Sequence, residues 1–122
     1  MFKICLIDEE KEFSPTVEWF FDEFLGEKNI KYELIYINPT GMEFNNVIKK
    51  ITEINFDLVL IDYMLITYHG DEIISKLNLE NPKLPKVILT NEPESFEEKN
   101  IEFRAINKND IDINDTNWAW KN

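Results

Sequence analysis

The stretch FDLVLIDYMLITYHG, residues 56–70, contains the clearest strand signal in the sequence. Residues 58–61 form an uninterrupted apolar run, which is typical of a strand buried on both faces, as in a parallel sheet covered by helices. The run ends on Asp62. In open α/β sheets, ligands bind just outside the carboxyl ends of the strands, where this carboxylate lies. Taken alone, Asp62 is better explained as the start of a polar loop, because Asp is common in loops.

Other segments of the chain alternate between strand-like and helix-like patterns. Four further apolar segments are predicted to be strands: residues 3–7, 32–37, 86–89 and 101–106. Helical spacing of apolar residues predicts three helices between them, built on Val17, Phe20, Phe21, Phe24 and Leu25, on Phe44, Val47, Ile48, Ile51 and Ile54, and on Ile73, Ile74 and Leu77. Residues 92–99 make at best a short fourth helix, and residues 109–122 lack the spacing of a full fifth one.

Local signals refine the ends of these helices. Ser14 followed by Pro15 predicts a capped helix start, and Thr40 with Glu43 has the spacing of a capping box. Trp19 falls outside the apolar stripe of its helix. We expect it to pack at the edge of the core, with a partly exposed contact as the alternative.

The alternating order predicts a doubly wound α/β fold with five parallel strands in the spatial order 2-1-3-4-5. The length of 122 residues suits one domain, and no repeat or linker divides it. We expect the core of that domain to span residues 2–108, with an atypical tail over residues 109–122.

Polar residues directly follow four of the predicted strands: Asp8 and Glu9, Asp62, Thr90 and Lys108. Three carboxylates at one edge of a sheet repel one another unless a cation neutralises them, and Mg²⁺ prefers oxygen ligands. A hydroxyl and an ammonium beside them are suited to binding phosphoryl oxygens, and an ionised Asp is a competent nucleophile. Any one of these residues is also explained as an ordinary surface residue.

The overall charge limits the partners. The formal net charge is −11, which argues against direct binding to nucleic acid or anionic membranes. No stretch approaches the length of a membrane span. The single Cys5 cannot form an intramolecular disulfide, so we expect a reducing, cytoplasmic environment.

Four motifs together resemble a response-regulator receiver domain, the phosphorylatable module of two-component signalling with a flavodoxin-like fold. In chain order they are ICLIDEE, DLVLIDYML, KVILT and AINK, and the resemblance covers residues 2–108. It implies that Asp62 is the phospho-acceptor, with Thr90 and Lys108 acting on the phosphoryl group. It also implies Mg²⁺ ligands at Asp8, Glu9, Asp62 and the backbone carbonyl of Met64.

Several positions depart from the receiver pattern. Glu9 stands where the family usually has Asp, and Ile66 replaces a common Pro. Ala105 occupies the position of the aromatic switch residue, and Asn109 replaces the Pro after the Lys. The missing ring at Ala105 bears on the family's usual coupling between the Thr and an aromatic residue, and the longer Glu9 bears on the geometry of the metal site.

The resemblance therefore implies a receiver that is phosphorylated on Asp62 by a sensor histidine kinase or a phosphotransfer protein, and that signals to a downstream protein target. The alternative is a receiver-like module that binds proteins without phosphorylation, favoured by Ala105 and the tail of residues 109–122. We do not expect an enzyme beyond self-phosphorylation and autodephosphorylation, because no His or base constellation supports turnover of another substrate.

Overall fold

The described residues form one parallel sheet with the strand order β2-β1-β3-β4-β5. The computed structural model describes residues 1–63, 65, 69–90 and 104–107. The strands are β1 Phe2–Ile7, β2 Tyr32–Ile37, β3 Leu58–Asp62, β4 Lys86–Thr90 and β5 Arg104–Asn107. The predicted fold class and strand order are confirmed. The first residues of the predicted fifth strand lie outside the described residues.

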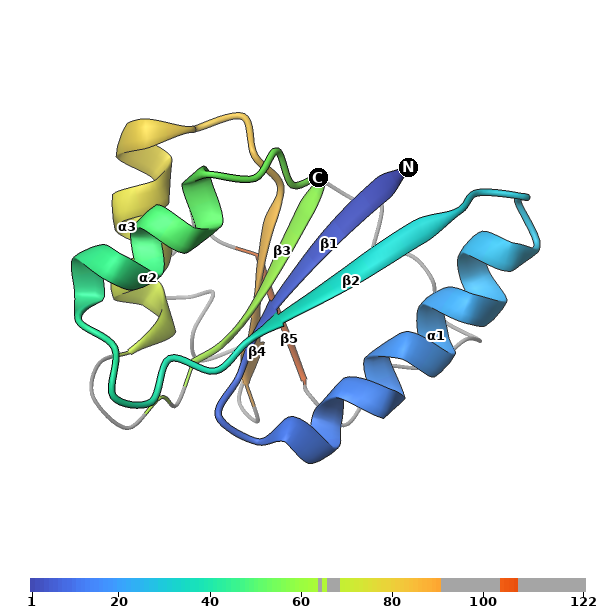
Figure 1. Cartoon of the computed structure of the whole chain (residues 1–122), viewed down its shortest axis with the longest axis horizontal. Coiled ribbons are helices and arrows are strands. Elements are labelled where there is room, and N and C mark those ends of the chain that lie inside the picture. The colour runs from blue at the N-terminus through green and yellow to red at the C-terminus, as the bar shows by residue number, and fades with distance from the viewer. Residues whose placement is uncertain (64, 66–68, 91–103, 108–122) are drawn as a thin grey trace.

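Helices cover both faces of this sheet. They are a 3₁₀ helix at Lys11–Phe13 (η1), α1 Ser14–Gly26, α2 Phe44–Thr52 and α3 Gly70–Glu80. Figure 1 shows α1 on one face and the pair α2 and α3 on the other. No helix among the described residues is long and apolar enough to cross a membrane. The predicted short fourth helix and the residues 109–122 lie outside the described part of the chain.

The buried strand β3 contributes side chains to two hydrophobic clusters, one on each face of the sheet. Leu58 and Leu60 pack with the apolar residues of α1, and Val59 and Ile61 pack with those of α2 and α3. This division follows from the period of two in a strand, which sends successive side chains to opposite faces. All four residues are buried, as the uninterrupted apolar run predicted.

The two predicted helix caps are wrong. Ser14 has helical backbone angles (φ −56°, ψ −45°) because η1 runs directly into α1, so Phe13 takes the cap position without a side-chain cap bond. At α2, Glu43 is itself the extended cap residue. The backbone N–H of Thr40 instead donates to Oδ1 of Asn38 at 3.0 Å, so Thr40 belongs to the preceding turn.

Cys5 is fully buried in β1, as predicted, and this burial raises the pKa of its thiol. The unfolded chain therefore releases the thiol proton as the pH rises above the ordinary value of 9.0, while the folded chain keeps it. We expect the free energy of unfolding to fall by up to about 1.4 kcal/mol per pH unit above that value. Urea unfolding measured below and above pH 9.0 checks this, and Cys5→Ala should lose this part of the slope. An unchanged slope in the variant would contradict the assignment.

Candidate functional site

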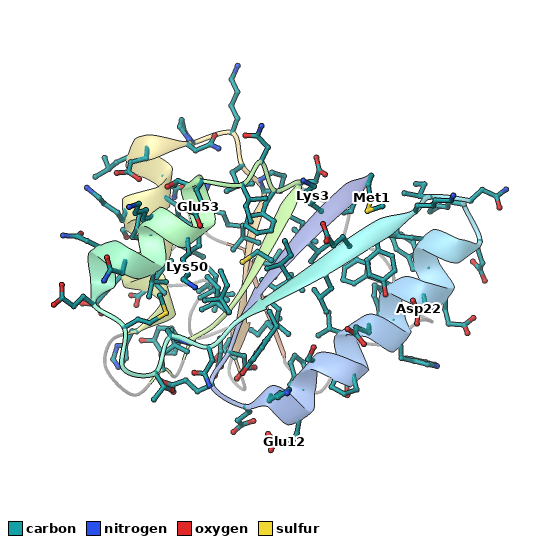
Figure 2. All side chains as sticks on the ribbon, in the orientation of Figure 1. Met1, Lys3, Glu12, Asp22, Lys50 and Glu53 are labelled. Carbon is teal, nitrogen blue, oxygen red and sulfur yellow. The ribbon has the colours of Figure 1, made fainter. Side chains whose placement is uncertain are left out.

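The carboxyl ends of β1 and β3 bring Asp8 and Asp62 next to each other. The two strands are parallel neighbours with Ile7 opposite Ile61, so the two Asp residues occupy the next positions of adjacent strands. In Figure 2, the labelled Lys3 lies near the start of β1, and the labelled Glu12 lies in η1, beyond the carboxyl end of β1. The predicted convergence of these two acids at one sheet edge follows from this register.

Asp8 is held firmly at its position. It is fully buried, its backbone N–H donates to the carbonyl of Ile37 at 3.2 Å, and its Oδ1 accepts the N–H of Glu10 at 2.8 Å. The two hydrogen bonds fix the carboxylate relative to β2 and to the turn that follows β1. Glu9 is half-buried in that turn.

Asp62 and Thr90 are the last residues of the adjacent strands β3 and β4. Asp62 is half-buried and lies opposite Leu89, and the buried Thr90 follows Leu89 at the end of β4. Thr90 in turn lies opposite Asn107, the last residue of β5. Asp8, Asp62 and Thr90 therefore lie along the same carboxyl edge of the sheet, at the ends of β1, β3 and β4.

Two predicted site residues, Met64 and Lys108, lie outside the described residues. Lys108 is the residue after Asn107, which the register pairs with Thr90. Over the described ranges, no three His, Cys, Asp or Glu side chains are grouped closely enough to hold a metal ion by themselves. The described chain thus supplies a pair of neighbouring acids at the strand ends rather than a complete three-acid cage.

Gly70 lets the start of α3 approach the end of β3. A Cβ at this position would lie 2.5 Å from the backbone oxygen of Asp62 and 2.9 Å from Cγ2 of Ile61, closer than real Cβ contacts. The backbone N–H of Gly70 also donates to the carbonyl of Tyr63 at 2.9 Å. The absence of a side chain at residue 70 therefore sets the distance between α3 and the candidate site.

We expect Gly70→Ala to lower the free energy of unfolding by about 1–3 kcal/mol, because the added methyl group forces β3 and α3 apart. Urea denaturation measures this change. Gly26→Ala is the matched control, since a Cβ there meets nothing within 4 Å, and it should leave stability unchanged or slightly raised. Equal effects of the two substitutions would contradict the close approach at Gly70.

Comparison with known proteins gives matches to solved structures. No protein-family model matches the sequence, and no curated protein matches it by sequence. The chemotaxis protein CheY4 of Vibrio cholerae matches with a TM-score of 0.66 and 18% identity, over 88% of this chain and 87% of that chain. The response regulator TrrA of Thermotoga maritima, solved with Mg²⁺ and BeF, matches with a TM-score of 0.60 and 20% identity, over 88% and 86%.

A structure of the histidine kinase ThkA in complex with TrrA also matches, with a TM-score of 0.52 and 23% identity, over 74% of this chain and 69% of that chain. The chain has the receiver fold. At these identities the likeness concerns the fold, and the site rests on the chain's own residues. Asp8, Asp62 and Thr90 lie at the carboxyl edge of this receiver fold, as the sequence motifs predicted.

Sequence reasoning missed two residues beside the site. Tyr63 follows Asp62, and its backbone N–H donates to the carbonyl of Leu89 at 3.0 Å. The second is His69, which is exposed and whose ring lies 5.1 Å from the ring of Tyr63, centroid to centroid. The spacing of His69 and Glu72 matches a capping box, but His is not a usual cap residue, so the pattern gave little signal.

Proposed function

We propose that the chain is a phospho-accepting receiver of two-component signal transduction, with Asp62 as the acceptor. The observation that carries this proposal is the register that sets Asp62 between the buried Asp8, which follows β1, and the buried Thr90 at the end of β4. A half-buried carboxylate at the carboxyl end of a central strand is open to a ligand from one side and held by the sheet on the other.

The proposed reaction transfers a phosphoryl group to Asp62. A carboxylate oxygen of Asp62 attacks the phosphorus of a phosphohistidine, the P–N bond breaks, and its electron pair returns to the imidazole, which takes up a proton. The product is an acyl phosphate on Asp62. The hydroxyl of Thr90 donates a hydrogen bond to a phosphoryl oxygen, and the ammonium of Lys108 neutralises part of its charge.

The residues at this edge fit Mg²⁺. The metal would be held by Asp8, Glu9, Asp62 and the backbone carbonyl of Met64. The described acids do not form a group of three, but Mg²⁺ keeps several waters and usually takes one or two carboxylates together with phosphate oxygens. Asp8 and Asp62, on adjacent strand ends, supply such a pair. When bound, the ion neutralises negative charge on the transferred group.

The structures similar to this chain support the same reading. TrrA was solved with Mg²⁺ and BeF, and a second structure holds TrrA together with the histidine kinase ThkA. We extend both features to this chain as part of the proposal: a sensor histidine kinase or a phosphotransfer protein as phosphodonor, and a downstream protein as target. We place this exchange in the cytoplasm, in line with the unpaired, buried Cys5.

A receiver-like interaction module that works without phosphorylation is the second candidate. Its supporting observation is Ala105, which lies in β5 opposite Ile88 and supplies no aromatic ring to respond to Thr90. In this alternative, partner binding is independent of Asp62. Turnover of a separate substrate is not part of either proposal, and the only chemistry proposed is the gain and loss of the phosphoryl group on Asp62.

Incubation with Mg²⁺ and acetyl phosphate, followed by borohydride reduction and peptide mapping, distinguishes the two candidates. The first predicts reductive trapping at Asp62 and none when Mg²⁺ is removed by a chelator. Trapping at another acid, or none in a folded sample, would overturn the phospho-acceptor proposal. Binding of a partner protein that is unchanged by Asp62→Ala would then favour the second candidate.

A further inference from the structure

The rings of Tyr63 and His69 are in contact beside the candidate site. Tyr63 follows Asp62 directly, and His69 precedes Gly70, the first residue of α3. Their ring centroids are 5.1 Å apart, with 36° between the ring planes. This separation and tilt lie in the range of attractive contacts between π systems. The two rings thus connect the residue after β3 with the residue before α3.

Backbone hydrogen bonds run through the same two ends. The N–H of Tyr63 donates to Leu89 of β4 at 3.0 Å, and the carbonyl of Tyr63 accepts the N–H of Gly70 at 2.9 Å. The N–H of His69 donates to Oε2 of Glu72 at 2.8 Å, inside the first turn of α3. These bonds form a continuous connection from β4, through the residue after Asp62, to α3.

The ring contact is separable from the hydrophobic core. His69 is exposed and Tyr63 is half-buried against the cluster formed by β3, α2 and α3. His69 is a member of neither core cluster, so its substitution leaves the buried residues of both clusters in place. What it removes is a restraint on Tyr63, and the backbone of Tyr63 is covalently joined to Asp62.

We propose that Tyr63 and His69 are a positioning pair, which we term the ring clasp, that holds the end of β3 and so orients the carboxylate of Asp62 for phosphoryl transfer. This inference rests on the proposed function. In-line attack requires the nucleophilic oxygen at a fixed distance and angle from phosphorus, and small displacements of a reacting group cost large factors in rate. The ring clasp sets that position without touching the phosphodonor.

Three substitutions at one position separate the ring contact from helix capping. His69→Phe keeps a ring but offers no cap, His69→Asn offers a cap but no ring, and His69→Ala offers neither. Two quantities are measured for each: the hydrogen exchange rate of the Gly70 amide without phosphodonor, and the rate of Asp62 phosphorylation by acetyl phosphate in saturating Mg²⁺.

The ring clasp predicts faster Gly70 exchange and phosphorylation slowed by about tenfold in His69→Ala and His69→Asn, with values near wild type in His69→Phe. Rescue by Asn and not by Phe would overturn it in favour of a capping role. Wild-type behaviour of all three variants would overturn it outright. If the wild-type chain is not phosphorylated but the exchange pattern holds, the proposed function fails while the contact itself stands.

Discussion

Replacement of Asp62 by Asn is expected to abolish phosphorylation of the chain by acetyl phosphate. The neutral amide lacks the ionised oxygen that attacks phosphorus, and no acyl phosphate can form on it. Asp62 is half-buried at the end of β3 and does not belong to the buried core, so the variant should stay folded. Intact-protein mass spectrometry measures the phosphate incorporated into each variant, and cleavage by hydroxylamine identifies it as an acyl phosphate.

Asp57→Asn is the matched control for this substitution. Asp57 lies just before the opposite end of β3 and is exposed, and its Oδ2 accepts the backbone N–H of Lys3 at 2.8 Å. An Asn oxygen can accept the same bond, so this variant should be phosphorylated at the wild-type rate. Undiminished labelling of Asp62→Asn would mean that another side chain is the acceptor.

Phe20→Ala is expected to destabilise the fold by about 3–5 kcal/mol, the usual cost of deleting a buried aromatic side chain. Phe20 is fully buried on the inner face of α1. Its ring packs edge-to-face on Phe21, with centroids 5.0 Å apart, and lies 5.6 Å from the ring of Phe24. Deleting it leaves a cavity between α1 and the sheet, which urea denaturation reports as a lower midpoint.

Trp19→Ala is the control from the adjacent position of the same helix. Trp19 is 49% exposed, so its removal should change stability by no more than about 0.5 kcal/mol. This exposure corrects the expectation that Trp19 packs at the edge of the core. Similar losses for Phe20→Ala and Trp19→Ala would contradict the assignment of the buried face of α1.

The fold was predictable because the spacing of apolar residues along a short segment indicates whether that segment is a strand or a helix and which face it buries. The run over residues 58–61 is buried on both faces, and the stripe of α1 matches its buried residues one for one. Parallel strands then force Asp8, Asp62 and Thr90 to one edge, so this part of the site followed from the topology.

Helix starts and loop contacts were less predictable because they depend on backbone angles and distant partners. Ser14 is not a cap because a 3₁₀ helix runs directly into α1. The cap preference of a single residue does not predict such a preceding turn. Tyr63 and His69 are six positions apart in the sequence, and no local periodicity specifies the contact between their rings. Sequence patterns alone therefore predicted which residues lie at the carboxyl edge of the sheet, but not the contact between Tyr63 and His69 beside Asp62.

A crystal structure of the chain with Mg²⁺ and beryllofluoride would show whether Asp62 is the phospho-acceptor. We expect beryllofluoride on a carboxylate oxygen of Asp62, Mg²⁺ between Asp8 and Asp62, and the hydroxyl of Thr90 and the amine of Lys108 facing the fluorides. A structure in which Asp62 carries no beryllofluoride under saturating conditions, with Asp8 and Lys108 directed to different sides of the molecule, would contradict this expectation.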